Sequence, residues 1–296
     1  MSYRSIYLYL SYSLILFYST YVVITNSINI DTYQRILSSI PFFVNFEFID
    51  IFSSEFLAEL FFLLLFSVFE VEPILIRLFF VWLAIFVFIA LFNKSGFFLL
   101  LLAITPPGEL LLFNITSFFI SSCFVIKFCI ELNKLNSNIF KCFFLALFAL
   151  MFHWSALIFL FFELFFILVF VKRAAIKNTF FYPLFGAISI LGIYVLNETL
   201  TSKLLAYSDQ NISYNKFHII MVFIYPLSLL ILKLFTKFKI INILRYSFLI
   251  AFILMLYLMG LMKVGSRLLF FIDFVLIFFI YEQISIYFRG KKELLI

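Results

Sequence analysis

Eleven apolar segments, separated by short polar or Pro- and Gly-containing breaks, follow one another along the 296 residues of the chain. They cover residues 6–24, 55–69, 74–92, 96–106, 110–130, 139–153, 155–171, 179–197, 218–235, 246–262 and 268–288. A helix needs about 20 apolar residues to cross the hydrocarbon core of a bilayer, and most of these segments approach that length. The pattern predicts an all-α, polytopic integral membrane helical bundle.

Composition excludes a water-soluble globule. Hydrophobic residues make up 66% of the chain and charged residues 12%, against roughly 45–50% and 25% in a soluble domain. We therefore expect one transmembrane domain over residues 1–296, with about ten transmembrane helices. Two longer polar stretches are expected to be external loops: 25–54, which has room for an interfacial helix, and 198–217.

Three of the segments, 55–69, 96–106 and 139–153, are too short to cross the bilayer comfortably. Short or broken helices are tolerated at membrane depth where protein or a water-filled cavity surrounds them. We expect 55–69 to be a re-entrant segment that dips in from the outside and returns. The alternative is that it crosses and that the N-terminus lies outside.

The basic residues predict the orientation. From Lys94 onward they gather in alternate loops, and with Arg4 fifteen of the 21 basic residues then lie on one side. That side is expected to be cytoplasmic, and it includes the C-terminus. Ten of the fifteen carboxylates fall on the opposite, outer side. The net charge of +6 is thus a topology signal, and no nucleic-acid partner is expected.

Several polar residues at the outer helix ends are candidates for chemistry. Glu59 lies inside an apolar run, where an ionised carboxylate needs water or a partner. Arg77, on the next segment, is either the ion-pair partner of Glu59 or a functional cation. His153, beside Trp154, is either an interfacial anchor or a group that transfers a proton near neutral pH. Lys263 and Arg267 flank Gly265 and would suit a phosphate, or would anchor to lipid headgroups.

Other classes of site lose support. The chain contains no P-loop, no HExxH, no GxSxG and no dinucleotide-binding glycine pattern. The three cysteines lack CxxC spacing, and the Glu70/Glu72 pair lacks the further ligands that a divalent cation requires. We expect no metal and no cofactor.

The order of these features resembles a known family. The first motif is the external Asp31-Thr32-Tyr33, and the second is Glu59-Leu60-Phe61-Phe62. The third is the block from Phe152 to Ile158, which reads FHWSALI, and the last is Arg267-Leu268. This order is similar to that of the Wzy/EpsG-like bacterial polysaccharide polymerases, the O-antigen and capsule polymerases. The His-x-Ser-Ala-Leu-Ile block is its most specific part. The chain departs from the family pattern in two places, since Leu60 replaces a proline and Thr116-Ser117 replaces an Arg-Gln pair.

The resemblance implies a glycosyltransferase that joins oligosaccharide repeat units carried on undecaprenyl diphosphate at the outer face of the bacterial inner membrane. It implies His153, Arg267 and Glu59 as catalytic residues. The expected substrate-binding residues are Asp31, Tyr33, Ser155, Lys263 and Arg77. Arg77 is included as a substitute for the arginine of the family's Arg-Gln pair, which this chain lacks. Expected partners are the lipid-linked oligosaccharide, membrane lipids, a flippase and a chain-length regulator.

Two other functions stay open at the level of the sequence. One is an O-antigen ligase or membrane acyltransferase, although a ligase should carry a larger external loop. The other is a flippase or transporter of lipid-linked sugars, although the polar residues concentrate at one face, with Glu163 and Asp273 as the midmembrane charges.

Overall fold

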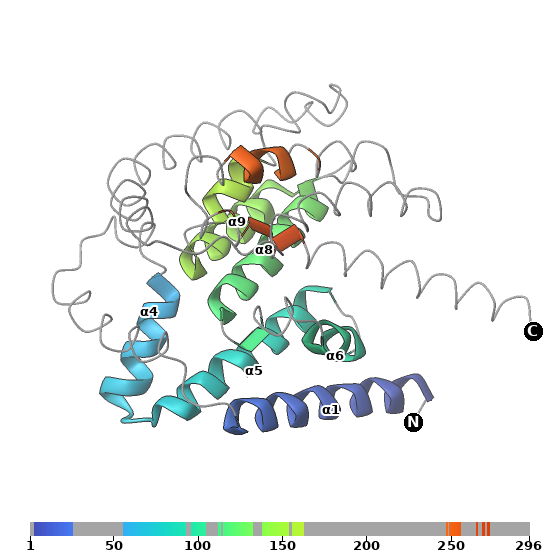
Figure 1. Cartoon of the computed structure of the whole chain (residues 1–296), viewed down its shortest axis with the longest axis vertical. Helices are drawn as coiled ribbons and strands as arrows, with labels where there is room; N and C mark the ends of the chain where they lie inside the picture. The colour runs from blue at the N-terminus through green and yellow to red at the C-terminus, as the bar shows by residue number, and fades with distance from the viewer. Residues whose placement is uncertain are drawn as a thin grey trace, which may run out of the picture. The chain divides into compact units, whose positions relative to one another are not determined.

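The computed structural model describes the chain over a set of ranges, most of them in its N-terminal half. These are residues 3–25, 56–92, 96–104, 112–113, 115–132, 138–153, 156–162, 247, 249–255, 265, 268–269 and 271–272. Within these ranges the regular structure is entirely helical and contains no strand (Figure 1). The expected all-α class is therefore confirmed for the described residues. The chain divides into two compact units, 1–195 and 196–296.

The described helices of the first unit begin and end close to the limits of the apolar segments, except at the start of α8. They are α1 (Tyr3–Thr25), α4 (Phe56–Leu63), the π-helix η1 (Leu64–Val68), α5 (Pro73–Phe92), α6 (Gly96–Ile104), α8 (Thr116–Leu132) and α9 (Ile139–Phe152). In the second unit, residues 249–255 are helical. Local chemistry explains several of these limits. Pro73 opens α5 at a position where its missing N–H costs nothing, and α6 ends at Ile104, two residues before Pro106.

Two of the described helices are long and apolar enough to cross a membrane: Ile6–Thr25 within α1, and Pro73–Phe92, which is α5. At 1.5 Å per residue, 20 residues extend about 30 Å, which is the thickness of the hydrocarbon core. The described helices thus support a membrane protein. The larger number of spans expected from the sequence stays a prediction. The single transmembrane domain also stays a prediction, and so do the external loops at 25–54 and 198–217. These two loops lie almost wholly outside the described residues.

The predicted short segment 55–69 is short in the structure too. Its helical part, α4 followed by η1, runs from Phe56 to Val68, and 13 helical residues extend only about 20 Å. It ends at a tight turn in which Glu70 has a φ of 51°, the left-handed conformation, and the Val71 N–H donates to the Leu65 carbonyl at 2.9 Å. This length fits a segment that does not cross, and its re-entry from the outside stays a prediction.

After the turn, α5 packs back onto α4 and η1 through aromatic side chains. Phe62 of α4 stacks on Phe80 of α5, with ring centroids 4.4 Å apart and an interplanar angle of 20°. Ala58 and Ile76 complete the buried part of this cluster. Offset stacking between aromatic rings adds about 0.5–1.5 kcal/mol beyond the area that is buried, so this hairpin is fixed by specific contacts as well as by apolarity.

Among the described helices, α8 and α9 make the most extensive contact, as an antiparallel pair that lies side by side in Figure 1. Contacts at three levels set its register. At one end Glu131 contacts Lys141, and in the middle Phe124 stacks with both Phe148 and Phe152. At the other end Ser121 contacts Ala149, and Phe118 contacts His153. α8 also packs against α5, which in turn packs against α1.

Candidate functional site

His153 lies where a helix is interrupted. α9 ends at Phe152, His153 has an extended backbone with φ −160° and ψ 124°, and residues 156–162 are helical again. The His153 carbonyl accepts a hydrogen bond from the Ala156 N–H at 3.0 Å, which ties the second helical piece to the break. The sequence predicted a boundary between segments 139–153 and 155–171, and the structure confirms it within one residue.

The break is buried against α8. His153 is 1% exposed, and its imidazole ring meets the ring of Phe118 edge to face, with centroids 5.1 Å apart. The Ala149 carbonyl accepts two hydrogen bonds here: one from the His153 N–H at 3.1 Å and one from the Ser121 hydroxyl at 2.8 Å. The side chain of His153 is therefore enclosed by protein, and its role as an interfacial anchor or as a proton-transfer group stays a prediction.

Arg77, the candidate second cation, is also buried, with 5% of its surface exposed. Its Nε donates to the carbonyl of Phe113 at 3.3 Å, 36 residues away in the sequence. The Phe113 ring is in turn 6.2 Å from the ring of Tyr18 on α1. Arg77 thus joins α5 to the chain just before α8 begins, and sequence reasoning had no signal for this partner.

Glu59 lies in the first turn of α4, next to the buried Ala58. Its Oε2 atom is shielded from solvent, which agrees with the expectation of a costly carboxylate in an apolar run. The ion pair between Glu59 and Arg77 stays a prediction.

The helices that carry the three described candidates belong to one packed group. α4, with Glu59, packs against α9, which ends at His153, and α5, with Arg77, packs against α8. The other candidates lie outside the described residues: Asp31, Tyr33, Ser155, Lys263 and Arg267. The structure therefore brings together the elements of Glu59, Arg77 and His153, and the remaining assignments stay predictions.

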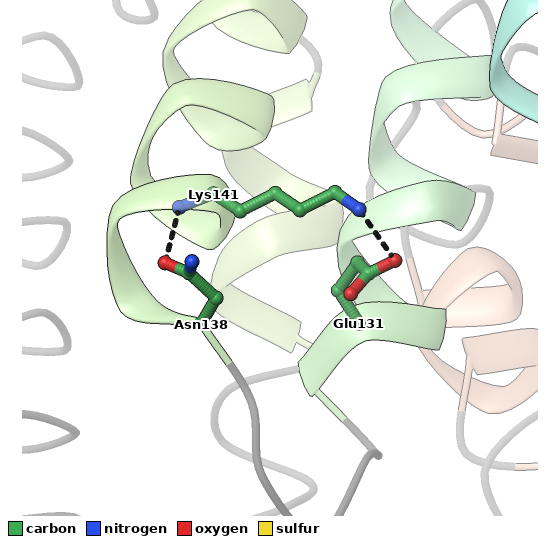
Figure 2. A network of polar contacts seen from close by, with 3 residues as sticks. All are labelled: Glu131, Asn138 and Lys141. Carbon is green, nitrogen blue, oxygen red and sulfur yellow. Dashed lines mark hydrogen bonds and ion pairs between the residues drawn. The ribbon is translucent and has the colours of Figure 1, made fainter.

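A second polar cluster lies at the opposite end of the α8–α9 hairpin (Figure 2). The Lys141 ammonium and the Glu131 carboxylate are 3.0 Å apart, and their side chains are 49% and 5% exposed. Asn138 caps α9, since its Oδ1 accepts a hydrogen bond from the Lys141 N–H at 3.2 Å. One turn before Glu131, the Lys127 ammonium lies 5.9 Å from the centre of the Phe92 ring. On the predicted topology this end faces the cytoplasm.

Among the described residues, no group of three or more His, Cys, Asp or Glu side chains could hold a metal ion. Comparison of the chain with protein-family models, with curated proteins and with solved structures finds no match. Any functional conclusion therefore depends on the residues themselves and on the resemblance that they carry.

Proposed function

We propose that the chain is a membrane polymerase that joins undecaprenyl-diphosphate-linked oligosaccharide repeat units into an O-antigen or capsular polysaccharide. It would act at the outer face of the bacterial inner membrane, as a bundle of about ten transmembrane helices with a re-entrant segment over 55–69. Its C-terminus would be cytoplasmic. The two membrane-length helices of the first unit support the setting in lipid.

One observation carries the proposal: the histidine of the His-x-Ser-Ala-Leu-Ile block lies at a buried helix break. In membrane proteins, helix breaks of this kind are found in segments that line a binding site, because irregular backbone is excluded from contact with lipid. An imidazole near neutral pH can take up and release a proton. The residue with the most specific resemblance is thus in a setting suited to general acid–base chemistry.

The proposed reaction needs a base and an anion-stabilising group. The acceptor hydroxyl oxygen forms a bond to the anomeric carbon of the donor sugar, while the bond from that carbon to the diphosphate oxygen breaks. The electron pair leaves with undecaprenyl diphosphate, and the hydroxyl proton passes to His153, with Glu59 as the second candidate base. The energy of the diphosphate linkage drives the step, so no nucleotide is required.

Arg267 and Lys263 are the cations that we assign to the leaving diphosphate, and Asp31, Tyr33 and Ser155 are assigned to the sugars. Arg77 differs from the other cations in the contact that it makes. Because it is buried and its Nε donates to a backbone carbonyl, its environment favours a role in holding the start of α8, beside which His153 packs.

A deletion strain tests the function. Loss of the polymerase should leave lipopolysaccharide or capsule with a single repeat unit, whereas loss of a flippase or a ligase should leave none attached. His153→Ala and Arg267→Ala should each abolish chain extension while membrane abundance stays at the wild-type level. A deletion strain that lacks the single-repeat product would overturn the proposal, and two variants that polymerise normally would overturn the site.

Cysteine labelling tests the topology separately. Ser266→Cys should react with an impermeant reagent from outside, and Thr179→Cys should react only after permeabilisation. The reverse pattern would show that the orientation is inverted.

A further inference from the structure

Two adjacent serines of α8, Ser121 and Ser122, are buried to the same extent but bond in different directions. Ser122 donates to the Phe118 carbonyl at 2.8 Å, one turn back within α8. Ser121 donates at the same distance to the Ala149 carbonyl of the neighbouring helix. A back-bond within its own helix is the usual arrangement for a serine in an apolar helix, so the bond of Ser121 between helices requires its own explanation.

The acceptor of Ser121 is the carbonyl that also receives the His153 N–H, at 3.1 Å. This carbonyl therefore links the hydroxyl on α8 to the backbone of the residue at the break. One turn earlier on α8, the Phe118 ring packs edge to face on the imidazole. α8 is thus linked to His153 in two ways. Phe118 contacts the imidazole of His153 directly, and Ser121 is linked to the backbone of His153 through the Ala149 carbonyl.

We propose that Ser121 is a positioning residue for His153. Its hydroxyl fixes the last turn of α9 against α8, and so sets where the helix ends and where the imidazole lies relative to Phe118. The catalytic consequence rests on the proposed function, in which His153 takes the acceptor proton. The geometric part does not, and it can be measured without any assumption about the reaction.

Ser122→Ala is the matched control for Ser121→Ala. Each variant removes one buried hydroxyl and one hydrogen bond to a carbonyl, so their effects on folding should be similar, but only Ser121→Ala breaks the link to α9. A misplacement on the order of 1 Å can lower a rate by about 10²-fold, and we expect Ser121→Ala to lower chain extension about tenfold and Ser122→Ala less than about twofold.

The geometric readout is the reactivity of His153 toward diethyl pyrocarbonate. The chain contains two histidines, so in a His218→Gln background the imidazole adduct reports on His153 alone. The buried ring should react slowly in the purified full chain. Ser121→Ala should raise the rate several-fold and Ser122→Ala should leave it unchanged.

Two further variants separate the hydroxyl from its volume. Ser121→Thr keeps a hydroxyl donor and should restore slow labelling and chain extension, whereas Ser121→Cys keeps the size but supplies only a weak donor and should not. Equal labelling in the Ser121→Ala and Ser122→Ala variants, or wild-type behaviour of Ser121→Cys, would overturn the proposal. Faster labelling in Ser121→Ala, together with normal polymer in His153→Ala, would uphold the positioning and refute the catalytic role of His153.

Discussion

The ion pair between Glu131 and Lys141 gives a quantitative test of the α8–α9 hairpin. The two residues lie ten positions apart, one on α8 and one on α9, with Nζ and Oε1 separated by 3.0 Å. Lys141→Met removes the ammonium and keeps most of the apolar stem. Glu131→Gln removes the negative charge and keeps the shape, and the double variant removes both charges.

The burial of the two partners sets the expected magnitude. Exposed ion pairs contribute about 0.2–1 kcal/mol, whereas breaking a fully buried pair costs about 3–5 kcal/mol. Here the carboxylate is 5% exposed and the lysine side chain is 49% exposed, so water screens one partner only. We expect Lys141→Met to destabilise the protein by about 1–2 kcal/mol, between these limits.

The double variant should cost less than the sum of the two single variants. Once the carboxylate has become an amide, loss of the ammonium no longer leaves a buried negative charge without that cation. We expect a coupling energy of about 1 kcal/mol, which should fall as salt is added because the lysine is partly exposed.

The assay is thermal unfolding of the purified full chain in detergent, repeated at low and high salt. Lys141→Arg is the control, since it retains the positive charge and should keep most of the stability. Strictly additive effects of the two single variants, or a coupling energy that is the same at both salt concentrations, would refute the reasoning from burial.

Three other predictions use the same unfolding assay. Asn138→Ala removes the side-chain acceptor that caps α9 and should cost about 1 kcal/mol, whereas Asn138→Gly should cost only a few tenths; wild-type stability of Asn138→Ala would show that the cap contributes nothing. Glu70→Gly should stabilise the turn after η1 by about 1 kcal/mol, because the left-handed φ of Glu70 costs a residue with a side chain more than it costs glycine. Glu72→Gly, the control two residues away, should give no such gain, and a loss of stability in Glu70→Gly would contradict the argument. Arg77→Met should cost about 1–3 kcal/mol because the buried Phe113 carbonyl loses the hydrogen bond from Nε. Arg77→Lys should restore this stability only in part, since lysine has no Nε–H. Full restoration by lysine would show that charge alone matters.

Much of the local structure could be predicted from the sequence. Helix α5 matches the predicted segment 74–92 within one residue, α6 ends two residues before the predicted limit at residue 106, and α9 ends one residue before the predicted limit at His153. One limit differs by more than two or three residues. The run 110–130 was expected to be one segment, but α8 begins only at Thr116, after a bend at Ile115. A hydropathy pattern cannot reveal this limit, because the residues before Thr116 are mostly apolar as well.

The candidate site divides in the same way. Residue type and position alone selected His153, Glu59 and Arg77, and the structure places their helices in one packed group. Nothing in the sequence indicated that Arg77 would bond to the Phe113 carbonyl, because backbone carbonyls carry no signature in a sequence. The sequence shows that serines are present within the apolar segment that forms α8. It does not show which of these serines faces α9.

The sequence by itself determined the helical class, the positions of several helix ends and the identity of the polar residues that an apolar chain retains. These features are local, because the length of an apolar run and the position of a proline act on the adjacent backbone. Only the tertiary structure decided the partners: Ser121 with Ala149, Phe118 with His153, and Glu131 with Lys141. The physical reason is that lipid and protein interior are both apolar, so a membrane helix carries little periodicity to show which face meets a neighbour. Packing and hydrogen bonds between helices make that choice, and they form only when the chain is folded.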